Sequence, residues 1–305
     1  MEDRRGEGLN AGLAELVSGD AVVRVSARGA EAVHWSIRGR DLLWDRSTSH
    51  WDRVAPILFP CVGWSRGGVI RVNNRIYPMP VHGFAHSSPF VLTGKTRDSA
   101  TFELNGSDPT FVFYPYAFRL GVQYALTPFA LRIELAVTNT GDDILPYACG
   151  VHPGFAWPFG AGEQDAYEIR FSEVERPAVP VITEDGLFSP QERVAPLAGR
   201  RLPLSPSLFN REALCFLDAK SRAICFAGPE GQLHAEADGF RHWALWSRPG
   251  APFLCLEAWT GHGDPERFDG DFREKPSLES LEPGAVRRHA LTLRFADSTT
   301  GPGAG

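Results

Sequence analysis

Residues 131–139 read LRIELAVTN, and this stretch decides the fold class. Leucine, isoleucine, leucine and valine stand at every second position, and arginine, glutamate, alanine and threonine stand between them. A period of two predicts a strand with one buried face and one solvated face. Strands of that kind are typical of antiparallel sheets, in which one face packs on the core and the other meets water.

Short runs of the same texture recur on both sides of this stretch. They are separated by glycine and proline, of which the chain has 31 and 24. We expect strands at 21–26, 32–37, 41–44, 99–104, 118–126, 131–139, 167–171, 213–217, 223–227, 243–246, 253–256 and 288–295. Helical periodicity is nearly absent, and we expect only a short helix within 11–17 and a single turn at 208–212. Such a chain is predicted to be all-β, with an antiparallel β-sandwich or a barrel.

No boundary between two domains is visible in the 305 residues. A chain of this length could form two domains, but all-β proteins of this size often form one. We therefore expect an N-terminal extension at 1–20, one β-sandwich domain at 21–297 and a flexible tail at 298–305. The stretch 177–206 is rich in proline and glycine and is expected to be a long connection within that domain.

Composition and charge exclude several classes of function. The formal net charge is −6 and the pI is near 5.9, so we expect no basic surface of domain size and no nucleic acid partner. No stretch approaches the roughly 18 apolar residues that span a bilayer, so we expect no membrane partner. Residues 1–10 are charged and polar and do not resemble a secretory signal.

The cysteines indicate a reducing environment. They are five in number, with no CxxC pair: Cys61, Cys149, Cys215, Cys225 and Cys255. Each lies in an apolar run, where a free cysteine behaves as a small buried hydrophobe. We therefore expect a reduced, cytoplasmic protein. No close pair of Cys or His residues has the spacing of zinc ligands, so we expect no metal.

Glu257 stands inside residues 253–259, FLCLEAW, an otherwise apolar run. A carboxylate is rarely buried unless it is paired or used in chemistry. Partial removal from water raises the pKa of a carboxyl group towards the range of a general base. The alternative is a salt bridge between Glu257 and an arginine at the end of the strand.

Two histidines stand in similar local frames of proline, glycine and phenylalanine. His82 lies in residues 78–84, PMPVHGF, and His152 lies in residues 150–155, GVHPGF. Proline fixes the backbone and glycine permits sharp turns, so both imidazoles are expected on stiff loops. A single loop histidine is more often structural, but two of them with a buried glutamate indicate an acid–base site. We therefore expect His82, His152 and Glu257 to meet in one pocket.

Aromatic side chains accompany these segments, and sugar rings pack well on aromatic faces. They are Trp64, Phe84, Phe155, Trp157, Phe240, Trp243, Trp246 and Trp259. The alternative is that aromatic residues fill the core, which is what we expect of Trp246 and Phe253. The chain has no phosphate loop, no GxGxxG opening a helix and no GxSxG elbow, so a nucleotide-dependent enzyme is disfavoured.

Taken in order, these segments resemble the aldose 1-epimerase (galactose mutarotase-like) superfamily, especially its LacX-like branch. The matching pieces are residues 56–63 (PILFPCVG), 77–85 (YPMPVHGFA), 114–118 (YPYAF), 150–155, 255–259 (CLEAW), 274–275 (EK) and 281–284 (LEPG). The resemblance extends from about residue 22 to residue 295.

The resemblance implies a single large β-sandwich with a sugar site on one concave face. The implied activity is that of an aldose 1-epimerase, or mutarotase, which interconverts the α and β anomers of a free aldose. By position, Glu257 would take the proton from the anomeric hydroxyl, His152 would protonate the ring oxygen, and His82 would hold that oxygen. No cofactor is implied. The implied partner is a small-molecule sugar, and we expect a monomer or a homodimer.

The resemblance also places further residues at the sugar. The substrate-binding residues expected from it are Arg66, Phe84, His86, Asn210, His242, Trp243 and Trp259. The sequence departs from the family pattern at four positions. Trp64 follows Gly63, whereas relatives often have an arginine soon after this glycine, and His86 stands where relatives usually have arginine. Ala258 stands where proline is common in the family, and Asn210 stands near the place where some relatives have an acidic pocket residue. These changes keep the acid and the base but leave the identity of the sugar open.

Two other functions stay open on the sequence alone. One is a non-catalytic carbohydrate-binding protein of the same fold, which would bind sugar without accelerating its mutarotation. The other is a mutarotase that acts on a hexose 6-phosphate, for which Arg66, Arg71 and Arg75 could supply positive charge. We expect those arginines to lie on a solvated strand face instead.

Overall fold

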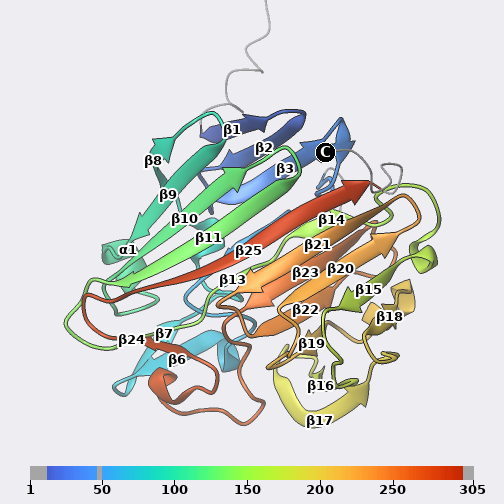
Figure 1. Cartoon of the computed structure of the whole chain (residues 1–305). Helices are drawn as coiled ribbons and strands as arrows, with labels where there is room; N and C mark the ends of the chain where they lie inside the picture. The colour runs from blue at the N-terminus through green and yellow to red at the C-terminus, as the bar shows by residue number, and fades with distance from the viewer. Residues whose placement is uncertain (1–11, 47–49, 298–305) are drawn as a thin grey trace, which may run out of the picture.

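The computed structural model describes residues 12–46 and 50–297, and strands form most of its regular structure (Figure 1). The largest sheet has nine antiparallel strands. Their order is β18 (Arg201–Pro203), β15 (Glu168–Phe171), β20 (Ala223–Gly228), β21 (Gly231–Asp238), β25 (Val286–Asp297), β11 (Ala130–Asn139), β10 (Phe118–Leu126), β9 (Ser99–Asn105) and β8 (Val91–Lys95). The long strand β25 crosses the middle of this sheet between β21 and β11 (Figure 1).

A second sheet of six strands carries the candidate site. Its order is β19 (Leu214–Phe216), β22 (His242–Trp246), β23 (Phe253–Trp259), β13 (Gly150–Val151) and β5 (Ile57–Leu58), and β14 (Gly154–Ala156) also pairs with β23. A four-stranded sheet of β1 (Leu13–Ser18), β2 (Ala21–Ser26), β3 (Glu31–Ile37) and β4 (Arg40–Asp41) lies at the upper end in Figure 1.

Three two-stranded sheets and a few short helical turns complete the described residues. The pairs are β6 (Val69–Val72) with β7 (Arg75–Pro78), β12 (Leu145–Tyr147) with β24 (Glu279–Leu281), and β16 (Ala178–Ile182) with β17 (Phe188–Val194). One α-helical turn is present, α1 (Asp108–Phe111). The 3₁₀ turns are η1 (Arg66–Gly68), η2 (Ala85–Ser87), η3 (Gln164–Ala166), η4 (Pro206–Phe209) and η5 (Phe272–Glu274).

The alternation of residues 131–139 has the predicted structural result. Leu131, Ile133, Leu135 and Val137 in β11 are each at most 1% exposed. Leu131 stands opposite Leu126 of β10 on one side and opposite a leucine of β25 on the other. The apolar face of β11 therefore joins those of its two neighbours, and the predicted all-β sandwich is confirmed.

One continuous core lies between the nine-stranded and six-stranded sheets, because inward side chains of both belong to it. In β23, Leu254, Leu256 and Ala258 belong to this core. Strand alternation turns Glu257 and Trp259 to the other face of the sheet. That face has its own smaller apolar cluster, which includes Leu58, Val62, Ala148, Phe188, Cys215, Ala244 and Trp259.

The expected short helix within 11–17 is wrong. Leu13–Ser18 forms strand β1, which pairs along its whole length with β2. Ala14 and Leu16 are buried while their neighbours are not, so strand pairing uses a period of two that overrides the local helical pattern. The sheet therefore begins before residue 20, and residues 1–11 of the predicted extension, like the predicted tail at 298–305, lie outside the described part of the chain.

The stretch 177–206 is also more ordered than predicted. It contains the β16–β17 hairpin and the edge strand β18. The turn at 208–212 is found slightly earlier, as η4. All five cysteines are buried and free, as expected. Within the described residues, no helix has both the length and the apolar character needed to cross a membrane.

Candidate active site

Glu257 is the buried centre of the site. All seven residues of β23 are buried, and Glu257 is 1% exposed. Two nitrogens meet at its Oε2 atom: the indole Nε1–H of Trp259 donates a hydrogen bond of 3.1 Å, and Nε2 of His152 lies 3.1 Å away. Burial raises the pKa of Glu257 well above its ordinary value, since the hydrogen bond from Trp259 opposes that effect only in part.

His152 follows β13 and faces Glu257 from the neighbouring strand. Its backbone N–H donates to the carbonyl of Pro56 at 3.1 Å, which fixes the chain at this point. The imidazole packs between two indoles, with ring centroids 5.0 Å from Trp51 and 5.8 Å from Trp246. Burial lowers the pKa of His152 well below its ordinary value, and the nearby His82 adds to this.

The two shifts favour the uncharged forms of Glu257 and His152. The carboxyl group therefore holds a proton more readily than an exposed carboxyl group does, and this proton can pass along the 3.1 Å contact to Nε2. A buried carboxyl group in contact with an imidazole is thus a unit that can both accept and donate one proton.

His82 completes the group, and its orientation is fixed by Gly63. The N–H of Gly63 donates to Nδ1 of His82 at 3.1 Å, and the N–H of His82 donates to the carbonyl of Gly63 at 2.9 Å. Because Nδ1 accepts, a neutral His82 carries its proton on Nε2. Its ring is nearly perpendicular to that of His152, with centroids 5.3 Å apart. The predicted meeting of His82, His152 and Glu257 is therefore present in the fold.

Glycine is required at two positions of the loops that hold His82. A Cβ at Gly83 would lie 2.1 Å from the carbonyl oxygen of Phe59, and a Cβ at Gly63 would lie 2.7 Å from the Cα of Gly263. Both glycines also have positive φ, 75° and 72°. His82 itself has a φ of 63°, which is uncommon for a residue with a side chain. The loop is thus held in a conformation that presents the imidazole.

A buried ion pair supports the same loops. Nζ of Lys275 lies 2.8 Å from Oδ1 of Asp264, and both side chains are almost fully buried. The other carboxylate oxygen of Asp264 accepts the backbone N–H of Arg66 at 2.8 Å, and the N–H of Asp264 donates to the carbonyl of Trp64. Lys275 therefore acts through Asp264 to position the Gly63 loop, and through it His82.

His242 lies on the same face of the sheet as Glu257. It stands opposite Trp259 in the register of β22 and β23. Its Nδ1 accepts the backbone N–H of Asp218 at 2.8 Å, so the proton of a neutral ring is on Nε2. That nitrogen is buried without a hydrogen-bond partner among the described residues. Burial lowers the pKa of His242 to about 3, with His262 contributing.

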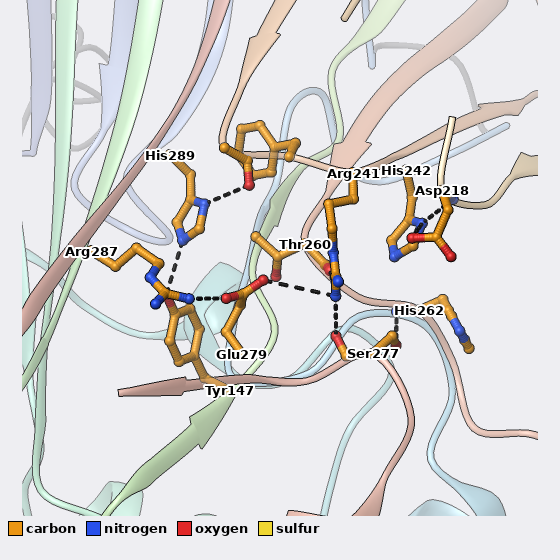
Figure 2. Close-up of polar contacts among 12 residues, drawn as sticks. Tyr147, Asp218, Arg241, His242, Thr260, His262, Ser277, Glu279, Arg287 and His289 are labelled. Atoms are coloured by element: carbon orange, nitrogen blue, oxygen red, sulfur yellow. Dashed lines mark hydrogen bonds and ion pairs between the residues drawn. The ribbon is translucent and has the colours of Figure 1, made fainter. Parts of the chain in front are cut away.

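A polar network stabilises the chain around His242 (Figure 2). Arg241 donates to the carbonyls of Thr260 and Ser277 and lies 3.8 Å from Glu279. The Ser277 hydroxyl in turn accepts the N–H of His262, whose ring lies 5.6 Å from that of His242. The network thus ties the ends of β22 and β23 to β24.

Two predicted substrate-binding residues are core residues instead. Phe84 is 4% exposed and packs against Phe59 and Phe118, with centroids 6.3 Å and 6.1 Å away. Trp243 is 2% exposed, and its Nε1–H donates to the carbonyl of Ser221. Trp243 adjoins His242 in sequence, so strand alternation turns it to the opposite face of β22. Both rings pack in the core, and a sugar contact at these two positions stays a prediction.

Of the other predicted residues, only Trp259 bonds directly to a member of the trio of His82, His152 and Glu257 among the described residues. Trp259 is bonded to Glu257, as described above. His86 is half-buried in η2, with Nε2 3.3 Å from the carbonyl of Val81. Arg66 is exposed on η1, next to the Gly63 loop. Asn210 is exposed after η4 and makes no hydrogen bond to the trio within the described part of the chain.

The sequence analysis missed two residues that border His152. Trp51 was not singled out, and no local pattern marks it. Trp246 was expected in the core; it packs against the core but is only half-buried, and its ring is nearly perpendicular to that of His152. The period of two along β22 could have found it, since Trp246 shares the face of His242. Among the described residues, no three His, Cys, Asp or Glu side chains are grouped so that they could hold a metal ion.

Comparison with known proteins gives concordant results. The family model described as aldose 1-epimerase matches residues 13–294. The chromosomal protein LacX of Lactococcus lactis subsp. lactis is 31% identical over 257 residues, which cover 80% of this chain and 86% of LacX.

Two solved structures are similar along almost the whole chain. A galactose mutarotase-like protein from Lactobacillus casei ATCC 334 has a TM-score of 0.87 at 25% identity, covering 93% of this chain and all of that one. A galactose mutarotase related enzyme from Lactobacillus acidophilus has a TM-score of 0.84 at 25% identity, covering 93% and 97%.

Proposed function

The chain belongs to the aldose 1-epimerase family, and from that premise we propose that it interconverts the α and β anomers of a free aldose by acid–base ring opening. The observation that carries the proposal is the buried 3.1 Å contact between Glu257 and His152, with His82 beside it. Ring opening needs one group to accept the proton of the anomeric hydroxyl and another to donate a proton to the ring oxygen. This pair can do both without a net gain or loss of protons.

The reaction begins when the sugar replaces the direct contact. The sugar enters between the two groups, so that its anomeric hydroxyl donates to Oε2 of Glu257 and its ring oxygen accepts from Nε2 of His152. The active form of the pair has the carboxyl proton transferred to the imidazole, which leaves a carboxylate as base and an imidazolium as acid. Glu257 takes the proton of the anomeric hydroxyl, His152 gives its proton to the ring oxygen, and the C1–O bond to that oxygen breaks.

Closure of the ring reverses these steps. Rotation about the C1–C2 bond turns the aldehyde, the hydroxyl formed from the ring oxygen attacks its other face, and that hydroxyl returns its proton to His152. Glu257 returns the other proton to the new anomeric oxygen, so the pair ends as it began. His82 assists as a neutral Nε2–H donor to the ring oxygen, because the Gly63 N–H fixes its tautomer.

Other groups on this face are suited to hold the sugar. His242 offers a second Nε2–H that has no protein partner among the described residues. The half-buried rings of Trp51 and Trp246 offer apolar surface for the C–H face of a pyranose.

We also propose a cytoplasmic location, since all five thiols are free and burial raises the pKa of each.

The proposal is tested by anomer exchange measured with NMR on a panel of aldoses and their 6-phosphates. Glu257→Gln keeps the shape of the side chain and an acceptor for Trp259 but removes the base. We expect the catalysed rate to fall by about 10²–10⁴-fold while sugar binding is kept. A rate that is unchanged by this substitution contradicts the role of Glu257.

A second candidate function is carbohydrate binding without turnover. The observation that favours it is the 1% exposure of Glu257, since a sugar must open the His152 contact before it reaches the base. In that case the wild-type protein binds an aldose yet leaves its exchange rate at the uncatalysed value. If a 6-phosphate is the substrate, its affinity falls with added salt, because exposed charge contacts such as those of Arg66 are screened.

A further inference from the structure

A hollow on the outer face of the nine-stranded sheet is unrelated to the trio. It arises because the side chains that β20 turns outward are short: Ala223, Cys225 and Ala227. Longer side chains rise from β15 and β21 on either side of this floor. The result is a hollow of about 490 Å³, lined by Arg170, Arg200, Arg201, Ala223, Cys225 and His234 among others.

The strand register concentrates positive charge at this hollow. Arg201, Arg170, Cys225, His234 and Arg294 stand opposite one another on five successive strands. Neighbouring strands lie only about 4.8 Å apart, so this row brings Arg170 and His234 beside the small Cys225 side chain, with Arg201 and Arg294 one strand further out on either side.

The positive charge is only partly balanced by acidic groups. None of the lining residues is acidic. Glu168, at the edge of the hollow, pairs with Arg170 and Arg201 at 2.5 Å and 2.8 Å. Arg200 donates only to the carbonyl of Ser172, and Arg294 has no ion pair within the described part of the chain. Burial lowers the pKa of His234, and Arg294 and Arg170 lower it further, as expected in a field of positive sign.

From this arrangement we propose that the hollow is a binding site for a compact multivalent oxyanion of the phosphate class. Guanidinium groups bind phosphate oxygens through paired, charge-assisted hydrogen bonds. Arg200 supplies unpaired donors, and Arg201 and Arg170 supply those not used by Glu168. The floor of Ala223 and Cys225 leaves room for an anion at the level of the sheet.

The site is separate from the proposed sugar site. The outer face of the nine-stranded sheet and the Glu257 face of the six-stranded sheet lie on opposite sides of the main core. A failure of the proposed catalysis therefore leaves this inference standing, and the reverse also holds.

The test is calorimetric titration of the full chain with inorganic phosphate and with pyrophosphate, at low salt and matched ionic strength. We expect saturable binding that is tighter for pyrophosphate and weakens as salt is added. The double variant Arg200→Gln/Arg201→Gln should bind at least about tenfold more weakly. Arg97→Gln, an exposed arginine elsewhere in the chain, is the matched control and should bind like the wild type.

A second variant tests the hollow rather than the charge. Cys225→Leu fills the floor and keeps every arginine, so it should also weaken binding at least about tenfold. Bound anion should raise the pKa of His234 in NMR titrations, because a nearby anion favours imidazolium. The proposal is overturned by the absence of saturable binding in the wild type, or by binding that Cys225→Leu leaves unchanged. Circular dichroism verifies that each variant is folded.

Discussion

Two buried acid–base pairs in this protein have similar geometry but different chemistry. His152 and Glu257 lie 3.1 Å apart, and Lys275 and Asp264 lie 2.8 Å apart, all four almost free of solvent. Lys275 and Asp264 form an ion pair whose carboxylate also accepts the backbone N–H of Arg66, so this pair fixes structure. In the other pair, burial raises the pKa of Glu257 and lowers the pKa of His152, which favours the uncharged form of both groups, so this pair can move a proton. Burial therefore does not by itself make a pair catalytic. What matters is whether the two groups can exchange a proton.

The pH dependence of anomer exchange is the largest effect that separates the two pairs. The active pair holds one shared proton, which is lost above the raised pKa of Glu257 and joined by a second below the lowered pKa of His152. We expect a plateau through neutral pH and a fall of about tenfold per pH unit beyond each limit. Rates measured by NMR across the stable pH range check this. An acid limb at or above the ordinary imidazole value of 6.5 speaks against the shared proton.

Stability changes with pH in the direction set by the same shift. The raised pKa means that folded Glu257 keeps a proton that the unfolded chain releases above about 4.5. The free energy of unfolding of the wild type, relative to Glu257→Gln, should therefore be greatest below that pH and decline as pH rises through the raised value. Denaturant titrations of both proteins at several pH values measure this difference.

Removal of one partner from the second pair is the next largest effect. Lys275→Met leaves the buried carboxylate of Asp264 without its cation and should cost about 3–5 kcal/mol of unfolding free energy. The matched control is Arg273→Met, because Arg273 is half-exposed and close in sequence. We expect the double variant Lys275→Met/Asp264→Asn to recover part of the loss. Equal unfolding midpoints for Lys275→Met and the control would show that the pair does not fix structure.

Gly83→Ala links the two pairs through the loop that presents His82. The new Cβ meets the carbonyl oxygen of Phe59 at 2.1 Å at a positive φ, so the loop must shift. We expect a loss of about 1–3 kcal/mol in unfolding free energy, together with a slower anomer exchange. Gly39→Ala is the control, since it has the same φ of 75° but open space around it. If both variants exchange anomers at the same rate, the loop does not position His82.

Much of the fold could be predicted from the sequence because its strands are locally encoded. The period of two in residues 131–139 and the apolar run at 253–259 led directly to β11 and β23. Strand β1 was misread because a six-residue strand carries little periodic signal, and its identity depends on pairing with β2. Hairpin β16–β17 was missed for a similar reason, since its exposed residues show no regular alternation.

The site was predictable only in part, because the sheet face to which a side chain points and the register of paired strands depend on tertiary structure. Glu257 was marked by its own strand, but its contact with His152 depends on how β13 and β23 pair. Phe84 and Trp243 stand beside site residues in sequence and yet turn into the core. Trp51 reaches His152 from a loop whose path no local pattern gives. The sequence shows which residue types are present and how they are spaced, but the register of neighbouring strands decides which of them share a face.

The most direct test of the central claim is a double-mutant cycle on Glu257→Gln and His152→Gln, with the rate of anomer exchange as readout. If the two residues act as one proton-sharing unit, either substitution alone removes almost the whole catalysed rate, and the double variant is about as slow as each single one. Sugar binding and circular dichroism confirm that the variants are intact. Independent effects, in which the two losses of rate multiply in the double variant, would contradict the account.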